Sequence, residues 1–459
     1  MVVDKQFISD VMRIALPITL QSVVMSLLNM TDQLMVGQLG ELAIASVGIS
    51  AKLSSIVSVV LTGLASGIAI YAAQYWGRGD HNRIRQLLGL GLGVGLLVAG
   101  GAAAAILLFP RQAMAPFTAD PRLLAEGSSF VQWLALSYLP CMATLIYSAV
   151  LRATGQVKLP LYASTAAVVI NVVLNYLLIF GHGGLPAMGL LGAALATCLA
   201  RVIELALLLL ASYRQKHLVA VTHWSALCGM ESGLLRRFLA TSLPLVLTEL
   251  VWVLGESAYG VVYGRMGTEQ LAAMTMTYPL QGLSIGLLCG LSGAASVLIG
   301  HRLGASDFAG AISYANRLMR LGGFLALLVG GGVALLAPHY VALYQTSAEV
   351  QQQGLFCVWV FCGFLWIKVG NMIVAGGVLN SGGDSKFVFG MESMATWLIG
   401  VPSGFLMAFY WQLPIQWVYL VLSCEEAVRL LVGYQRVRSR KWLRNLVHEE
   451  PAAEEAALA

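Results

Sequence analysis

The chain consists largely of long apolar stretches, and this feature restricts its possible folds more than any other. Crossing the hydrocarbon core of a bilayer, about 30 Å thick, takes roughly 20 helical residues. Irregular backbone cannot face lipid, so each crossing stretch is expected to be a helix. The sequence therefore predicts an all-α polytopic membrane protein with twelve transmembrane helices. The expected spans lie near residues 12–37, 44–75, 86–109, 125–151, 160–181, 187–213, 238–263, 270–300, 313–337, 350–378, 387–410 and 414–435.

The amount and placement of charge agree with a membrane protein. Hydrophobic residues make up 58% of the chain and charged residues 11%, about half the charged fraction of a soluble domain. Most of the 27 Lys and Arg residues fall in alternate loops, whereas the opposite loops hold only Arg111, Arg122 and Arg265. The positive-inside rule then predicts a multi-pass plasma-membrane protein, in a bacterium an inner-membrane one, with both termini in the cytoplasm. The first apolar stretch is too long for a cleavable signal peptide.

The basic residues behind the net charge of +5 flank the apolar spans. We therefore expect them to contact anionic lipid headgroups rather than nucleic acid. A lipid bilayer is therefore a predicted partner, and nucleic acid is not.

The two halves of the chain resemble each other at an offset of about 227 residues. "LPITLQSVVMSLLNMTDQLMVGQLG" from Leu16 is similar to "LPLVLTELVWVLGESAYGVVYGRMG" from Leu243, and "VLRATGQVK" is similar to "VLNSGGDSK". Each half holds six spans and therefore has the same orientation, which predicts two six-helix bundles related by a pseudo-two-fold axis along the membrane normal. The predicted organisation is an N-terminal lobe (1–211), a cytoplasmic linker (212–237), a C-terminal lobe (238–436) and a cytoplasmic tail (437–459).

Asp32 lies within the first apolar span, where an unpaired carboxylate costs several kcal/mol unless it faces protein or water. The same half offers Asn171 and Asn175, one helical turn apart, and Thr197. A carboxylate, amide oxygens and a hydroxyl form a site suited to a hard cation, and the carboxylate could instead carry a proton. Pairing with the buried Lys52 is the structural alternative.

A second acidic group lies in the seventh span. Glu249 and Glu256 are two turns apart, and aromatic residues share their face. Carboxylates beside aromatic rings suit an organic cation, although such rings often serve packing alone. The residues considered for substrate binding or coupling in this half are Glu249, Trp252, Glu256, Tyr259, Lys368 and Asn371, with Tyr263 continuing the aromatic face and Lys368 a possible ion-pair partner.

Other charged residues within the spans have simpler interpretations. Arg201 with Glu204, and Glu425 with Arg429, have the spacing of ion pairs within one helix. Glu392 has no evident partner, and its role is left open.

The sequence lacks the motifs of several enzyme classes. No G-x-x-x-x-G-K-[ST] segment occurs, so no ATP-binding P-loop is expected. No nucleophile with a neighbouring base and no metal-ligand spacing is evident. The protein is therefore expected to be neither an enzyme nor a cofactor-dependent protein.

The segments "TDQLMVGQLG", "AQYWGRGD", "VLRATGQVKLP", "INVVLNYLLIFG", "GLLGAALAT" and "VLNSGGDSKF" resemble the multidrug and toxic compound extrusion (MATE) family. This family is part of the multidrug/oligosaccharidyl-lipid/polysaccharide exporter superfamily. The resemblance covers the chain from about residue 10 to 436 and implies a V-shaped fold of two six-helix lobes. It also implies exchange of Na⁺ or H⁺ against amphipathic, often cationic, organic compounds.

Carried over residue by residue, the resemblance puts a first-lobe cation site on Asp32, Asn171, Asn175 and Thr197, with Na⁺ possible at the first three. Some members have a second aspartate where this chain has Asn175, so the choice between Na⁺ and H⁺ stays open. In the second lobe the family's seventh-helix acid corresponds to Glu249 or Glu256.

The family's second acid in that lobe aligns near Val369, where this chain has none. The resulting prediction is a monomeric antiporter that uses alternating access to export small organic cations. A flippase for lipid-linked saccharides is the alternative.

Overall fold

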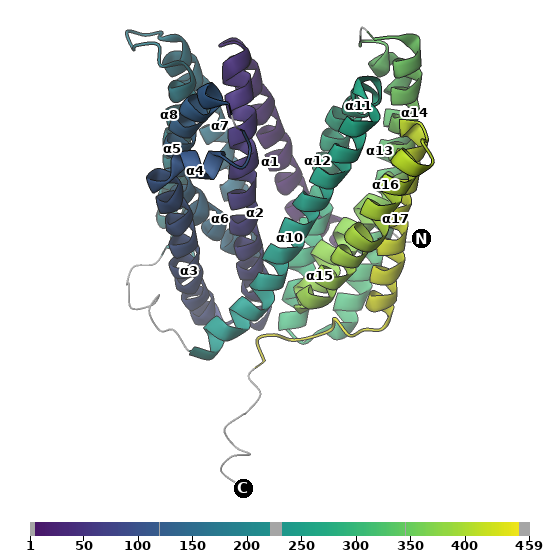
Figure 1. The fold of residues 1–459 in the computed structure, drawn as a ribbon. Helices are drawn as coiled ribbons and strands as arrows, with labels where there is room; N and C mark the ends of the chain where they lie inside the picture. Colours follow the sequence, from purple (N-terminus) through teal and green to yellow (C-terminus); the bar gives the residue numbers. More distant parts are fainter. Residues whose placement is uncertain (1–4, 119, 221–231, 345, 449–459) are drawn as a thin grey trace, which may run out of the picture.

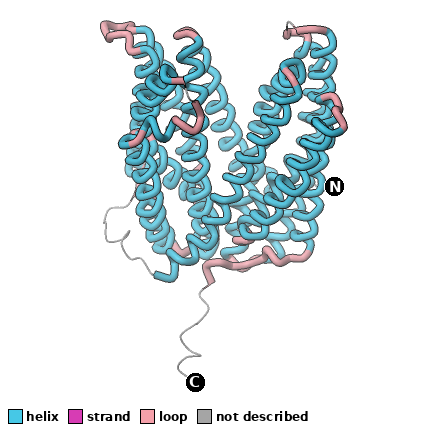
Figure 2. The backbone as a smooth tube through the Cα atoms, viewed as in Figure 1, coloured by secondary structure: helices cyan, strands magenta, loops and turns pink. Residues whose placement is uncertain are grey.

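The computed structural model describes residues 5–118, 120–220, 232–344 and 346–448, and these residues are almost entirely helical (Figure 2). The helices of the first half are α1 (Lys5–Gly37), α2 (Glu41–Arg78), α3 (His81–Leu108), α4 (Pro110–Met114), α5 (Pro121–Ala135), α6 (Tyr138–Ala153), α7 (Lys158–Phe180) and α8 (Gly189–Arg214). Those of the second half are α10 (Ser232–Met266), α11 (Thr268–Thr275), α12 (Thr277–Gly304), α13 (Phe308–Val341), α14 (Ala348–Asn371), η1 (Met372–Leu379), η2 (Asn380–Gly382), α15 (Ser385–Met394), η3 (Ala395–Gly400), α16 (Val401–Phe405), η4 (Leu406–Tyr410) and α17 (Ile415–Arg438).

The helices form two lobes that meet at one end and diverge at the other, as a V (Figure 1). We call α1–α8 the N-lobe and α10–α17 the C-lobe, and we refer to the closed end and the open end of the V. The turn between α2 and α3 lies at the closed end, as do the start of α10 and the last described residues of the chain (Figure 1). The basic residues Arg78, Arg83 and Arg85 therefore mark the closed end.

The expected spans are present as helices. Ten helical stretches of described residues are long and apolar enough to cross a membrane, and the bent pair α5–α6 makes an eleventh. The twelfth, α17, has 24 residues and carries Glu425, Glu426 and Arg429 near its middle. The predicted fold of twelve helices in two bundles is confirmed.

One expected span is not a single straight helix. The stretch predicted at 125–151 is divided into α5 and α6, which meet at an angle of 43°. Pro140 explains the break, because a proline ring clashes with the carbonyl four residues earlier, here that of Leu136 between the two helices. The tenth and eleventh spans also contain π-helical segments, η1 and η3–η4, which often occur at functional sites.

The two halves are locally equivalent. Both α1 and α10 contain an internal proline, Pro17 and Pro244. Asp80 and Asp307 cap the N-termini of α3 and α13, accepting hydrogen bonds from the backbone N–H of Arg83 (3.1 Å) and Gly310 (2.8 Å). Each of these aspartates follows a glycine three residues earlier, Gly77 and Gly304, so the same Gly-x-x-Asp segment gives the same helix-start geometry in both halves.

The lobes exchange helix ends where they meet. The start of α1, including Val11, packs in the apolar core of the C-lobe, and the start of α10, including Phe238, packs in that of the N-lobe. Small residues bring the helices close: a Cβ added to Gly67 would lie 1.9 Å from the Ser242 hydroxyl, and one added to Gly290 would lie 2.2 Å from the Ala15 carbonyl oxygen. Close approach through small residues is a common way to pack helices in membranes.

The proposed domain boundaries are not tested by the structure and stay predictions. Residues 221–231 of the linker and 449–459 of the tail lie outside the described residues.

Candidate functional site

The polar residues expected in the N-lobe come together between α1 and α7. The Nδ2 of Asn175 donates to Asp32 Oδ1 at 2.6 Å and to Asn171 Oδ1 at 3.0 Å. Both asparagines are buried, each with 2% of its surface exposed. Their i, i+4 spacing on α7 turns both amides toward α1, as the sequence predicted.

Two of these residues, Asp32 and Asn171, border a cavity of about 100 Å³, whereas Asn175 is not among the residues that line it. Asp32, Asn171 and Thr197 line it, and the Thr197 hydroxyl donates to the Ala193 carbonyl oxygen at 3.0 Å. The Oδ1 of Asn175 is buried and accepts no hydrogen bond from the described residues. An acceptor left unpaired beside a carboxylate suits a bound cation or a water molecule.

The charge on this cavity is negative. Arg201 and Glu204 line it together with Asp32, and the Arg201 Nη1 lies 2.8 Å from Glu204 Oε2. The i, i+3 pair expected from sequence is therefore present, and in the described part of the chain two carboxylates and one guanidinium leave a formal charge of −1. Lys52 does not compensate it, because it forms no ion pair among the residues that the structure describes. The suggested pairing of Asp32 with Lys52 is absent.

A larger cavity of about 330 Å³ lies where the N-lobe meets α12. Arg152, Arg201 and Glu204 are its charged lining residues in the described part of the chain, and Cys289 of α12 completes the wall from the C-lobe. Its formal charge is +1, opposite to that of the smaller cavity beside Asp32.

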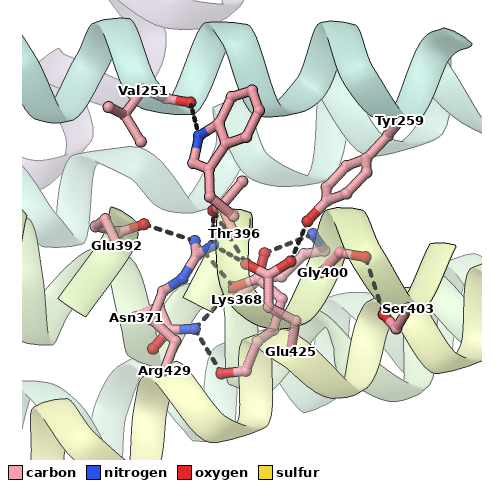
Figure 3. Close-up of polar contacts among 12 residues, drawn as sticks. Val251, Tyr259, Lys368, Asn371, Glu392, Thr396, Gly400, Ser403, Glu425 and Arg429 are labelled. Carbon is pink, nitrogen blue, oxygen red and sulfur yellow. Dashed lines mark hydrogen bonds and ion pairs between the residues drawn. The ribbon is translucent and has the colours of Figure 1, made fainter. Parts of the chain in front are cut away.

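The C-lobe contains a network of charged side chains centred on Arg429 of α17 (Figure 3). Its guanidinium lies 2.9 Å from Glu392 of α15 and 3.6 Å from Glu426, and it forms a further ion pair with Glu425. Thr396 of η3 joins the network, accepting a hydrogen bond from Arg429 at 3.1 Å and donating one to Glu425 at 3.2 Å. Side chains from three helical segments, α15, η3 and α17, therefore contact this one guanidinium.

This network corrects two sequence interpretations. Glu392, which had no evident partner, is paired with Arg429. Lys368, suggested as a partner for the acids of the seventh span, is instead paired with Glu426, with Nζ 3.0 Å from Oε1. The predicted residue Asn371 also donates to Glu426 Oε2, at 2.8 Å. Because α14 and α17 pack side by side in the C-lobe, side chains of the two helices can form ion pairs. The rotation of each helix about its own axis determines which side chains meet.

Three of the predicted residues of α10 face a second small cavity, of about 50 Å³. Trp252, Glu256 and Tyr259 line it, and the Tyr259 hydroxyl donates to Glu425 (Figure 3). Tyr263 also lines the cavity, as the aromatic stripe predicted, whereas Glu249 lies outside the lining set.

The charge of the C-lobe cavity is also negative. Its charged lining residues in the described part of the chain are Glu256, Lys368, Glu425, Glu426 and Arg429. Three carboxylates and two cations leave a formal charge of −1, as in the cavity beside Asp32. Each lobe thus holds a small polar cavity with one uncompensated negative charge.

Sequence reasoning missed the extent of the Arg429 network. The i, i+4 spacing of Glu425 and Arg429 indicated one pair, but nothing local connects Glu392 or Thr396 to it. The one available signal was Glu392 itself, an acid in an apolar span that needed a partner.

Comparison with known proteins places the chain in a family. The family model MatE matches residues 17–177 and 244–430, so it matches the chain twice, with starts 227 residues apart. A probable multidrug resistance protein NorM of Bradyrhizobium diazoefficiens is 26% identical over 453 residues, covering 95% of this chain and 94% of the relative. The uncharacterized transporter YisQ of Bacillus subtilis is 21% identical and covers 96% of both chains.

Solved structures share the fold. One is described as the outward-facing conformation of a multidrug resistance MATE family transporter of the MOP superfamily, with a TM-score of 0.85, 18% identity and 96% of both chains covered. A MATE structure in complex with MaL6 has a TM-score of 0.86 at 18% identity, covering 94% of this chain and 95% of that one. With the family model matching most of its length in two equivalent halves, the chain belongs to the MATE family of membrane transporters.

Proposed function

We propose that this protein is a cation-coupled antiporter that exports amphipathic organic compounds by alternating access. The observation that carries the proposal is the N-lobe cavity, where Asp32 leaves one negative charge uncompensated beside amide and hydroxyl oxygens. Na⁺ or H⁺ would neutralise that charge, and binding of either would stabilise the conformation that holds the site closed. The names of the NorM relatives, multidrug resistance proteins, support organic compounds as cargo.

The cargo we propose is cationic. The cavity of the C-lobe carries a formal charge of −1 and presents the rings of Trp252 and Tyr259 beside Glu256. Charge and cation–π attraction together favour an organic cation. If coupling ion and cargo exchange, each must weaken the binding of the other by the same factor.

The proposed orientation follows from the basic residues of the closed end, which the positive-inside rule assigns to the cytoplasm. The open end of the V then faces outward, and both termini lie in the cytoplasm of a bacterial cell. We propose that a single chain carries out transport, since each lobe contains its own polar cavity.

A flippase for lipid-linked saccharides is the second candidate. The observation in its favour is the larger cavity, where Arg152 and Arg201 outnumber Glu204. A phosphate-bearing cargo would use that positive charge, whereas an organic cation would avoid it.

The test is transport by purified protein in liposomes, with Na⁺ and pH gradients imposed independently and ethidium as the cargo. We expect one of the gradients to drive ethidium accumulation, and Asp32→Asn to abolish the dependence on it while the protein stays folded. Gln33→Ala is the matched control, because Gln33 is the exposed neighbour of Asp32 on the same helix. Gradient-driven transport that persists in Asp32→Asn would refute the assignment, and movement of a pyrophosphate-linked saccharide without ethidium transport would favour the flippase.

A further inference from the structure

The chain does not end with α17 but continues along the closed end, beneath the C-lobe as far as the place where the two lobes meet (Figures 1 and 2). We call residues 439–447 the strap. Two of its side chains are almost fully buried, with 1% of Trp442 and 1% of Val447 exposed. Trp442 belongs to the apolar core of the C-lobe, and Val447 belongs to that of the N-lobe. The strap therefore starts on one lobe and ends anchored in the other.

Gln74 of α2 connects the strap to both lobes. Its side chain is completely buried. The amide Nε2 donates to the carbonyl oxygen of Ser381 in the C-lobe at 2.7 Å and to that of Arg444 in the strap at 3.3 Å. Its Oε1 accepts the backbone N–H of Leu446 at 2.7 Å. One side chain of the N-lobe thus holds the C-lobe and the strap at once.

Further hydrogen bonds fix the strap on either side of Gln74. Asn445 donates to the Gly304 carbonyl oxygen at 3.3 Å and to the Ser306 hydroxyl at 3.0 Å, both in the C-lobe. Arg78 of the N-lobe donates to the carbonyl oxygen of Val447. The C-lobe surface is shaped for the strap, since a Cβ added to Gly382 would lie 1.7 Å from the Trp442 carbonyl oxygen.

The strap is bonded to Gln74 and Gly304, at a place where the two lobes approach each other closely. A Cβ added to Gly77 of α2 would lie 1.9 Å from the His301 carbonyl oxygen of α12, and one added to Gly304 would lie 1.9 Å from the Gln74 carbonyl oxygen. His301 Nε2 also lies 2.6 Å from the Ala153 carbonyl oxygen at the end of α6. Separating the lobes at this end requires breaking these contacts and those of the strap together.

We propose that the strap is a latch that holds the closed end shut in the outward-open conformation and must be released before the inward-open conformation can form. The proposal rests on alternating access. Because the strap is covalently part of the C-lobe, its hydrogen bonds to Gln74 and Arg78 contribute only while the lobes are together. Loss of each bond is expected to raise the ratio of inward-open to outward-open molecules about fivefold.

The test measures the distance between spin labels at Asn82→Cys and Ala309→Cys, two exposed positions at the closed end, one in each lobe. The native cysteines are first replaced. The measurement compares the full chain with a chain ending at Arg438, which lacks the strap, and with a control chain ending at His448, which keeps it. No cargo or ion gradient is added.

We expect a longer-distance population to grow at least about fivefold in the chain ending at Arg438, and no change in the control. Gln74→Leu is the second variant, because it removes the three hydrogen bonds of this side chain and keeps Trp442 in place. Unchanged distances in folded protein for both variants would overturn the latch, as would an equal change in the control chain.

The same proteins in the ethidium assay separate this proposal from the proposed function. A shift in distances without ethidium transport in any variant would leave the latch standing and refute the transport function proposed above. Ethidium transport with unchanged distances would refute the latch and leave the proposed transport function standing.

Discussion

Replacing Arg429 by Met tests how the C-lobe holds its charges. In the folded protein the Arg429 side chain is 8% exposed, and its partners Glu392 and Glu425 are 11% and 3% exposed. Methionine fills a similar volume but leaves these two carboxylates without a cation, whereas Glu426 keeps Lys368 at 3.0 Å. Breaking a buried ion pair by removing one partner costs about 3–5 kcal/mol.

The carboxylates can limit this cost by taking up a proton. For a glutamate with its ordinary solution pKa, protonation at pH 7 costs about 3.7 kcal/mol, which falls within the same range. We therefore expect Arg429→Met to lower the free energy of unfolding by about 3–5 kcal/mol. Equilibrium unfolding of the purified protein in mixed micelles measures this difference.

Two further variants make the measurement specific. Adding Glu425→Gln to Arg429→Met removes one of the stranded charges and should recover part of the lost stability, which a double-mutant cycle quantifies. Arg302→Met is the control, since Arg302 and Asp307 form an ion pair with side chains 34% and 43% exposed, and such pairs are worth about 1 kcal/mol or less. If Arg429→Met costs no more than Arg302→Met, or if Glu425→Gln gives no recovery, the reasoning is refuted.

Two other predictions concern the closed end. In Gly304→Ala the new Cβ would lie 1.9 Å from the Gln74 carbonyl oxygen, so this variant should separate α2 from α12. The spin-label measurement should then show a larger fraction of inward-open molecules. Gly264→Ala is the control, because Gly264 has open space around it, and it should leave the distances unchanged. The Gly310 backbone N–H, with Arg302, holds the pKa of Asp307 below its ordinary value of 3.8. Asp307→Asn should therefore cost a little stability at pH 7, and the difference should vanish as the pH falls below that ordinary value and wild-type Asp307 takes up its proton; a difference that stays constant from pH 7 to 3 would contradict this.

The two negatively charged cavities differ in how their charged groups are arranged. The N-lobe site is built from one carboxylate with neutral amides, whereas in the C-lobe one guanidinium gathers three carboxylates. In the antiport that we propose, the first arrangement is the one that binds the coupling ion. The second holds its charges in fixed pairs and leaves Glu256 of the cavity lining without a cation of its own among the described residues.

The features that depend on local spacing could be predicted from the order of the amino acids. Apolar length alone predicts the helices, and the 227-residue repeat predicts two equivalent lobes, because both follow from the order of residues along one chain. The cluster of Asn171 and Asn175 also follows from the sequence, since residues four apart on a helix share a face. Asp32 could be assigned to it through the resemblance to the MATE family.

Which distant side chains meet depends on the packing of the helices and could not be predicted from spacing along the chain. Glu392, Lys368 and Arg429 lie on three different helical segments, and their pairing depends on how each helix is rotated and how closely it packs against its neighbours. The strap is a similar case: the sequence shows basic residues after the last span, but only the packed structure shows that Trp442 is buried in the C-lobe and Val447 in the N-lobe. Helical periodicity acts over a few residues, whereas these contacts join residues that only packing brings together.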